Sequence, residues 1–170
     1  MNNNDILRRL RFAFDFSNKQ ATSLFALDPS SSVTMTQAAF LARLAKDDDD
    51  DFVECSDTEL AAFLDGLIVT KRGLRETPLP AAAAPSSKAS RLSKNDILKK
   101  LRIAMSFQEQ QMLEMLKLGG TELSKSELGA LFRSPSHKHY RACGNQVLRA
   151  FIKGLTLTLR DEMNEDNPTG

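Results

Sequence analysis

Basic residues cluster at two matching places in the chain, each near the start of a predicted helix. Cations at a fixed separation suit the regular phosphates of a nucleic acid, so both clusters are candidate RNA or DNA contacts. The alternative is a solvated helix face, on which cations pair with carboxylates one helical turn away. The candidate cations are Arg8, Arg9, Arg11, Lys99, Lys100 and Arg102. Three such pairs are present: Asp5 with Arg9, Arg11 with Asp15, and Asp96 with Lys100.

A third concentration of polar and charged side chains lies between residues 133 and 143 and holds both histidines of the chain. His137, His139 and Cys143 are zinc-ligand types, but a structural zinc site needs four ligands and this segment offers no fourth Cys or His. We therefore expect no metal. The candidate binding residues of this segment are Arg133, His137, Lys138, Tyr140 and Arg141.

Thiol chemistry is the one catalytic arrangement that the sequence suggests. Cys143 precedes a predicted helix start, where the helix dipole lowers a thiol pKa, and His139 is a base close by in sequence. Cys55 occupies the matching place earlier in the chain without a nearby His, so we expect both cysteines to be small buried residues. No Gly-rich phosphate loop, Ser-His-Asp set or carboxylate pair is found. We expect a protein that is not an enzyme and has no cofactor, with Cys143 and His139 as the exception.

Five successive carboxylates, Asp47 to Asp51, stand where the later segment has Pro135 to His139. They lack the alternating ligands and the Gly of a calcium loop, which favours a solvated acidic loop. Charge is divided unevenly, because residues 1–76 carry a net charge of −4 and residues 77–170 a net charge of +5. The second half is therefore the expected partner of an anion.

Both halves descend from one duplicated unit. Asn4 to Phe16 matches Asn95 to Phe107 at eight of thirteen positions, with an offset of 91. Cys55 to Arg72 matches Cys143 to Arg160 at eight of eighteen positions, with an offset of 88. The first copy thus holds three extra residues, expected within Asp28 to Ser32. This period is longer than the 20 to 50 residues or so of solenoid repeats, so two tandem modules are predicted.

Each copy is predicted to contain four helices. Asn4 or Asn95 is the expected N-cap of the first helix, and the third and fourth helices begin with capping boxes. The fourth helix shows apolar residues at i, i+3, i+4, i+7 and i+8 and contains Gly66 or Gly154, which indicates a close helix crossing and allows a shared interface between the copies. The predicted capping boxes are Thr34 with Gln37, Ser124 with Glu127, and Ser56 with Glu59.

The fold class is therefore all-α, with two tandem homologous four-helix modules packed together. Module 1–76 is joined to module 94–161 by a Pro/Ala/Ser-rich linker at 77–93, and 162–170 is expected to be a flexible tail. The longest apolar runs, such as Ala38 to Ala42, are far shorter than the roughly 18 residues of a membrane span. Met1 to Asn4 does not resemble a signal peptide, and the chain has two cysteines. We expect a cytoplasmic protein without membrane contact.

Three motifs together resemble the bacterial YehS-like proteins, a family of unknown function with two copies per chain. They are the repeated N-D-I-L-x-x-L-R-x-A, the fourth-helix pattern L-x-x-F-L/I-x-G-L, and the loop from Ser134 to Cys143. The resemblance implies a small cytoplasmic bacterial protein and brings no activity or cofactor. The family's loop has Asp before His-Lys, where this chain has Ser136.

Two functions follow as hypotheses. The first is a binding protein whose second copy holds RNA or DNA phosphates, because the cations of residues 99–102 and 133–141 are expected to converge. The second is an interaction or scaffold protein that takes a partner helix in an apolar groove between the modules. The oligomeric state is left open.

Overall fold

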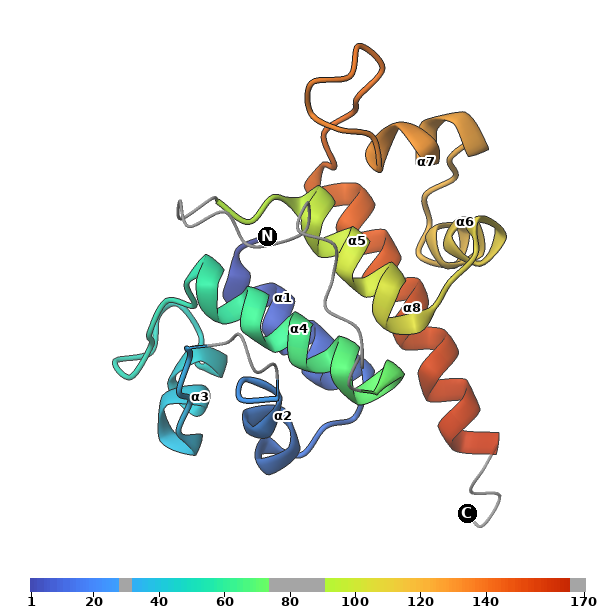
Figure 1. Ribbon diagram of the computed structural model, residues 1–170. Helices are drawn as coiled ribbons and strands as arrows, with labels where there is room; N and C mark the ends of the chain where they lie inside the picture. Colours follow the sequence, from blue (N-terminus) through green and yellow to red (C-terminus); the bar gives the residue numbers. More distant parts are fainter. Residues whose placement is uncertain (28–31, 74–90, 166–170) are drawn as a thin grey trace.

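Eight α-helices and their connections make up the described part of the chain, residues 1–27, 32–73 and 91–165 of the computed structural model (Figure 1). These residues contain no strand, which confirms the all-α prediction. The first copy consists of α1 (Asn3–Ala13), α2 (Asn18–Leu24), α3 (Gln37–Leu44) and α4 (Asp57–Arg72). The second copy consists of α5 (Lys94–Met105), α6 (Glu109–Leu118), α7 (Lys125–Leu131) and α8 (Asn145–Glu165).

The helix starts reproduce the two offsets of the duplication. The starts of α1 and α2 lie 91 residues before those of α5 and α6, and the starts of α3 and α4 lie 88 residues before those of α7 and α8. The three extra residues of the first copy therefore lie between α2 and α3. Their expected place, Asp28 to Ser32, falls mostly outside the described residues, as do most of the predicted linker at 77–93 and the end of the predicted tail. Helix α8 continues to Glu165, into the segment 162–170 that we expected to be a tail.

Two of the predicted capping boxes are present. Ser56 with Glu59 caps α4 and Ser124 with Glu127 caps α7, both as predicted. Gly73, at φ 79°, ends α4, in a left-handed conformation that glycine adopts without strain.

Three predicted caps are wrong. The N-cap of α1 is Asn2, whose side chain accepts from the backbone N–H of Asp5, and the N-cap of α5 is Ser93. Helix α3 is capped by Thr36 rather than Thr34. Asn4 and Asn95 lie inside the first turn of their helices, because their side chains have partners elsewhere in the fold.

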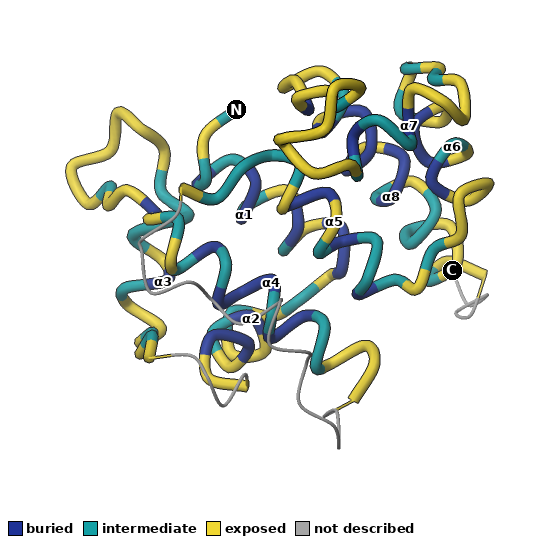
Figure 2. Tube along the Cα trace, turned by 45° about the horizontal axis from the view of Figure 1, so that its top comes forward, coloured by how far each residue is buried: buried dark blue, intermediate teal, exposed yellow. Residues whose placement is uncertain are grey.

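The first and last helices of the two copies join the modules. Helix α1 packs along α8, and α4 packs along α5, so each first helix lies against the last helix of the other copy. Helix α2 crosses α4, and α6 crosses α8 within its own copy. Figure 2 shows the buried segments concentrated on the inner sides of these helices, with exposed loops around them. The apolar stripe of α1 (Ile6, Leu7, Leu10, Ala13) and that of α5 (Ile97, Leu98, Leu101, Ala104) are buried.

Gly66 and Gly154 allow two helices in the same copy to touch through their backbones. A Cβ on Gly66 would lie 1.8 Å from the carbonyl oxygen of Leu24 in α2, and one on Gly154 would lie 1.8 Å from that of Met115 in α6. The predicted close crossing is confirmed. The glycines themselves face the second helix of their own module, and the interface between the copies lies beside them, where Asp65 pairs with Lys100 of the other copy.

Candidate functional site

The connection between α7 and α8, residues 133–143, carries most of the predicted binding residues and is here named the cationic loop. Its backbone is fixed by local turns: the N–H of His137 donates to the carbonyl of Ser134 (2.8 Å), and the N–H of Tyr140 donates to that of His137 (2.9 Å). The N–H of Arg141 donates to the carbonyl of Ala130 in α7 (3.1 Å), which closes the loop at its base.

Asn95 of α5 ties this loop to the helical core. Its Nδ2 donates to the carbonyls of Leu131 (2.8 Å) and Arg141 (2.9 Å), and its Oδ1 accepts from the backbone N–H of Cys143 (2.8 Å). The hydroxyl of Tyr140 donates to the same oxygen (3.1 Å). One amide side chain thus satisfies both ends of the loop, which explains its position inside the helix rather than at its cap.

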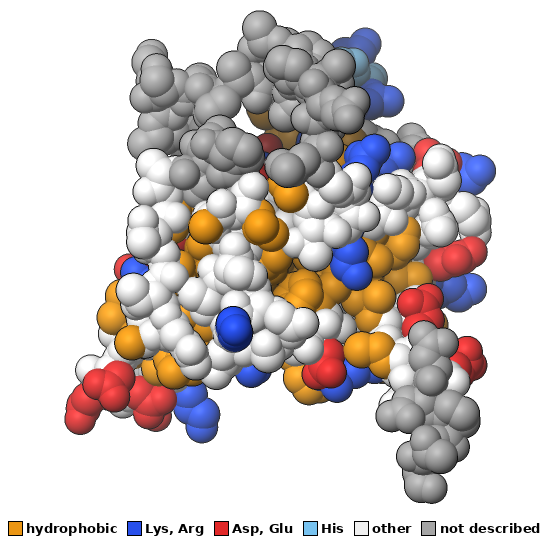
Figure 3. Space-filling model, turned by 60° about the horizontal axis from the view of Figure 1, so that its bottom comes forward, with side chains coloured by type: hydrophobic (Ala, Val, Ile, Leu, Met, Phe, Trp, Pro, Cys, Tyr) orange, Lys and Arg blue, Asp and Glu red, His pale blue; other side chains and the backbone are white. Residues whose placement is uncertain are grey.

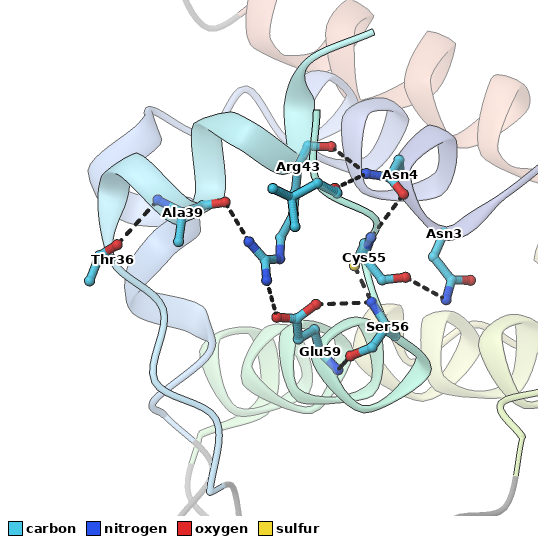
Figure 4. Close-up of polar contacts among 9 residues, drawn as sticks. Asn3, Asn4, Thr36, Ala39, Arg43, Cys55, Ser56 and Glu59 are labelled. Carbon is cyan, nitrogen blue, oxygen red and sulfur yellow. Dashed lines mark hydrogen bonds and ion pairs between the residues drawn. The ribbon is translucent and has the colours of Figure 1, made fainter. Parts of the chain in front are cut away.

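The first copy contains the same anchor (Figure 4). Nδ2 of Asn4 donates to the carbonyls of Arg43 and Val53 (both 2.9 Å), and its Oδ1 accepts from the N–H of Cys55 (2.9 Å). Asn4 is fully buried. The signal in the sequence was the repetition of both Asn and Cys at matching positions, which we interpreted as a cap and a packing residue separately.

A shallow, open hollow of about 580 Å³ lies between α7 and the cationic loop. Arg133, His139, Tyr140 and Arg141 line it from the loop, so the structure brings four residues of the predicted segment together. Glu127 lines it from α7 and forms an ion pair with Arg141 (3.2 Å). The remaining lining residues are Ser126 and Ala130.

Glu127 limits the positive charge of this hollow. The backbone N–H and hydroxyl of Ser124 and the guanidinium of Arg141 hold the pKa of the Glu127 carboxyl below its usual value. The carboxylate therefore neutralises Arg141 at neutral pH. Arg133 and Lys138 are exposed and form no ion pair with any described residue, so they are the cations of the loop that a ligand meets.

The three predicted cations of α5 have different surroundings. Lys100 forms an ion pair with Asp65 of α4, away from the cationic loop. Arg102 lies over the ring of Phe132, 4.8 Å from its centre, and donates from Nε to the carbonyl of Phe107. Lys99 is exposed and lies between Asn95 and Arg102 on the same helix face, since these positions are four and three residues away. Arg102 therefore lies beside Phe132 at the base of the cationic loop and Lys100 lies away from it, while Lys99 has no described contact with the loop.

The predicted cations of α1 do not converge with the cationic loop. Arg8 pairs with Asp5 (2.6 Å) and Asp47 (3.8 Å) and donates to the carbonyl of Ala45 (2.7 Å). Arg11 donates to Asn18 (3.0 Å). The predicted pairs Asp5 with Arg9, Arg11 with Asp15, and Asp96 with Lys100 are absent among the described residues. Arg9 is exposed and lines a different hollow, between α1 and α8.

The acidic run Asp47 to Asp51 occupies the connection between α3 and α4, the counterpart of the cationic loop. In Figure 1 the two connections lie at the left and at the top of the molecule. Figure 3 shows acidic side chains gathered at the lower left of one face, with histidine, lysine and arginine side chains at the opposite corner. The end of the molecule that carries the acidic run is therefore negatively charged, and the end that carries the cationic loop is positively charged.

The two cysteines are buried, as predicted. Burial raises the pKa of the Cys143 thiol to about 11 and that of Cys55 to about 12, so neither is a thiolate at neutral pH. Cys143 donates weakly to the carbonyl of Gly144, while His139 is exposed in the open hollow. Within the described residues, no three His, Cys, Asp or Glu side chains are grouped to hold a metal ion.

Comparisons with known proteins agree with the resemblance found in the sequence. A family model described as "Protein of unknown function (DUF1456)" matches residues 3–73 and 94–161. The "Uncharacterized protein YehS" of Escherichia coli (strain K12) is 37% identical over 156 residues, which cover 91% of this chain and 94% of that protein. No solved structure matches the chain. None of the helices in the described ranges has the length and hydropathy that crossing a bilayer requires.

Proposed function

The chain belongs to the DUF1456 family of proteins of unknown function, and we propose that it is a non-enzymatic protein that binds the phosphates of RNA or DNA through the cationic loop of its second copy. One observation carries the proposal. At the place where the first copy has five aspartates, the second copy holds a loop with the same backbone turns and the same Asn anchor, bearing cations instead. A fixed backbone with exposed cations suits a regular polyanion.

The uncompensated charge of the loop supports this function. Arg133 and Lys138 have no carboxylate partner among the described residues, and Lys99 is exposed on α5, one helical turn after the Asn95 that anchors the loop. Their counterparts in the first copy are Ala45, Asp50 and Arg8, of which Arg8 is neutralised by Asp5 and Asp47. At these three positions, therefore, the second copy offers cations whose binding to phosphate breaks no ion pair with a described residue, and the first copy does not.

The ring of Tyr140 adds a surface for a base. It lines the hollow beside Arg133 and His139, and its hydroxyl is held by Asn95. Unstacked bases bind to aromatic rings and to the planes of Arg side chains, a mode that RNA-binding proteins use for single strands. We therefore expect single-stranded nucleic acid to bind more tightly than duplex.

Fluorescence anisotropy with a labelled 16-nucleotide single-stranded RNA, titrated at several salt concentrations, tests the proposal. We expect the affinity to fall steeply with salt. In R133A/K138A the slope of log K against log salt should become less steep by about 1.4, because each lost phosphate contact reduces the magnitude of the slope by about 0.7. The matched control is K19A/K117A, which removes two exposed lysines outside the loop and should leave the slope unchanged.

A charge transplant provides the stronger version of the test. The triple variant H137D/K138D/H139D gives the second copy the residues found at 49–51 of the first copy, and we expect it to abolish binding. The proposal is wrong if the wild-type protein shows no binding at low salt, or if the loop and control variants reduce binding equally.

A further inference from the structure

The two seams that join the copies are equivalent by duplication but differ in charge. Helices α4 and α5 form one seam, and α8 and α1, their counterparts in the other copy, form the second. Asp65 of α4 corresponds to Lys153 of α8, and Lys100 of α5 corresponds to Arg9 of α1. One seam therefore pairs an acid with a base, whereas the other brings two bases together.

The α4/α5 seam is closed by its charged pair. Lys100 and Asp65 form an ion pair, with their side chains 27% and 29% exposed. A carboxylate at this place thus lies at the rim of the seam and neutralises the cation of the neighbouring helix. The pair shows which chemical group fits this position of the fold.

The α1/α8 seam is open at the same position. Arg9 and Lys153 line one hollow of about 170 Å³, and neither forms an ion pair with a described residue. Apolar side chains border the two cations: Phe12 is 57% exposed and Leu157 is 43% exposed. Two like charges facing the same small hollow repel each other, and an anion between them removes that repulsion.

Arg160 holds the apolar rim in place. Its guanidinium lies 4.0 Å from the centre of the Phe12 ring, donates to the Phe12 carbonyl (2.8 Å) and pairs with Asp15 (3.4 Å). The exposed ring of Phe12 is therefore held in one position by its contact with Arg160. A preorganised aromatic group beside a charged group is a common feature of protein interaction hot spots.

We infer that this hollow, here named the α1/α8 hollow, binds an acidic side chain of a partner protein, with an adjacent apolar side chain of the same segment against Phe12 and Leu157. The carboxylate takes the place between Arg9 and Lys153 that Asp65 holds beside Lys100. A hollow of this volume holds one side chain, and its exposed apolar rim favours a helical segment with an acid and a leucine on one face over a nucleic acid strand. This site is separate from the cationic loop.

Two labelled 16-residue helical peptides test the inference with the full chain. One presents Glu and Leu four residues apart on one face, and the other has Gln in place of each Glu. We expect the Glu peptide to bind at least about tenfold more tightly, and R9E or K153E to remove that difference. The control K19E changes an exposed lysine of α2 and should retain it. Equal binding of the two peptides, or an unchanged preference in K153E, overturns the inference.

The variant K153D provides a second readout, because it copies the residue of α4 into the equivalent place of α8. We expect it to pair with Arg9, to lose the Glu peptide and to raise Tm by about 2 °C, as the repulsion is replaced by an ion pair. An unchanged Tm with retained peptide binding would contradict the inference.

Further measurements distinguish a partner protein in the α1/α8 hollow from RNA or a second copy of this chain. R133A/K138A should bind the Glu peptide as the wild type does, so this site and the cationic loop fail or succeed separately. Sedimentation of the wild type and R9E tests whether a second copy fills the hollow. A salt-sensitive dimer lost in R9E, or loss of RNA binding in R9E, assigns the hollow to that occupant and overturns the inference of a partner protein.

Discussion

The connection before the last helix has the same backbone in both copies and opposite side-chain charge. Three backbone hydrogen bonds fix the connection in the first copy: the N–H of Asp49 donates to the carbonyl of Lys46, that of Phe52 to the carbonyl of Asp49, and that of Val53 to the carbonyl of Ala42. In the second copy the residues 88 positions later form the same three hydrogen bonds. The anchoring Asn is also the same. The anchor and the main chain thus determine the path of the loop, which left its exposed side chains free to diverge.

The two copies share the features that maintain the fold and differ in the charges at the surface. The features shared by both copies, namely the Asn anchor, the buried Cys and the helical Gly, hold each module together. The features that differ, namely the charge of the loop and the charge of the seam, lie at the surface, where ligands bind. Four experiments test this division, the first two on shared features and the last two on charged side chains that differ between the copies.

We expect Gly66→Ala and Gly154→Ala to have the largest effects. The added Cβ would meet a backbone carbonyl of the crossing helix, and two helices must separate to admit it, at a cost above about 3 kcal/mol. Gly129→Ala is the control in α7, where no atom lies within 4 Å of the new Cβ, and should stabilise by up to about 1 kcal/mol. Urea unfolding measures all three. A mild effect in one copy alone would show that the crossings are not equivalent.

Replacing the anchor should come next. Asn4→Ala leaves two carbonyls and one N–H of a buried site without partners, and we expect a loss of about 3 kcal/mol. Asn95→Ala should cost about 2 kcal/mol, because Asn95 is only partly buried and water can replace some of its bonds. Asn2→Ala removes a simple cap and should cost about 1 kcal/mol. If it destabilises as much as Asn4→Ala in urea unfolding, the anchor has no special role.

The pH dependence should differ between two capping glutamates. Burial acts to raise the pKa of Glu59, but hydrogen bonds from Arg43 and Ser56 hold that pKa below its usual value. A carboxyl with a lowered folded pKa stabilises the fold above its unfolded pKa and loses this contribution as the pH falls through the folded value.

Glu59→Gln keeps a capping side chain and removes the charge, so its unfolding free energy should fall less than that of the wild type on acidification below about pH 4.5. At neutral pH it should cost about 1 kcal/mol through the bond to Arg43 (2.5 Å). Glu127→Gln, at an exposed cap of the second copy, should flatten the pH profile less. Identical acid profiles for the wild type and Glu59→Gln would contradict this assignment.

The smallest effect concerns the first-helix cations at matching positions. Arg8→Ala removes an ion pair with Asp5 and a bond to the Ala45 carbonyl, and should cost about 1 kcal/mol. Lys99→Ala removes no ion pair or hydrogen bond to a described residue and should change stability by less than about 0.5 kcal/mol. Thermal unfolding distinguishes the two. A larger loss for Lys99→Ala would mean that this lysine is structural and not available to a ligand.

Much of the fold was predictable because its determinants lie close together in the sequence. Capping residues three positions apart, apolar residues on one helical face and the two offsets of the duplication all report interactions within a turn or between identical segments. They predicted the all-α class, the duplication and the capping boxes at Ser56 and Ser124. Asn4 was misassigned for the same reason, since an Asn near a helix start is compatible with a cap unless its distant partners are known.

Partners far apart in the sequence were decided by the tertiary structure alone. The amino-acid pattern determined that Arg8, Arg9, Lys99 and Lys100 would line helix surfaces, but only the packing of each first helix on the other copy's last helix decided their surroundings. That packing gives Lys100 an aspartate and places Arg9 beside Lys153. The physical reason is range: helix formation depends on neighbours within four residues, whereas the charge that a side chain meets depends on which helix packs against it.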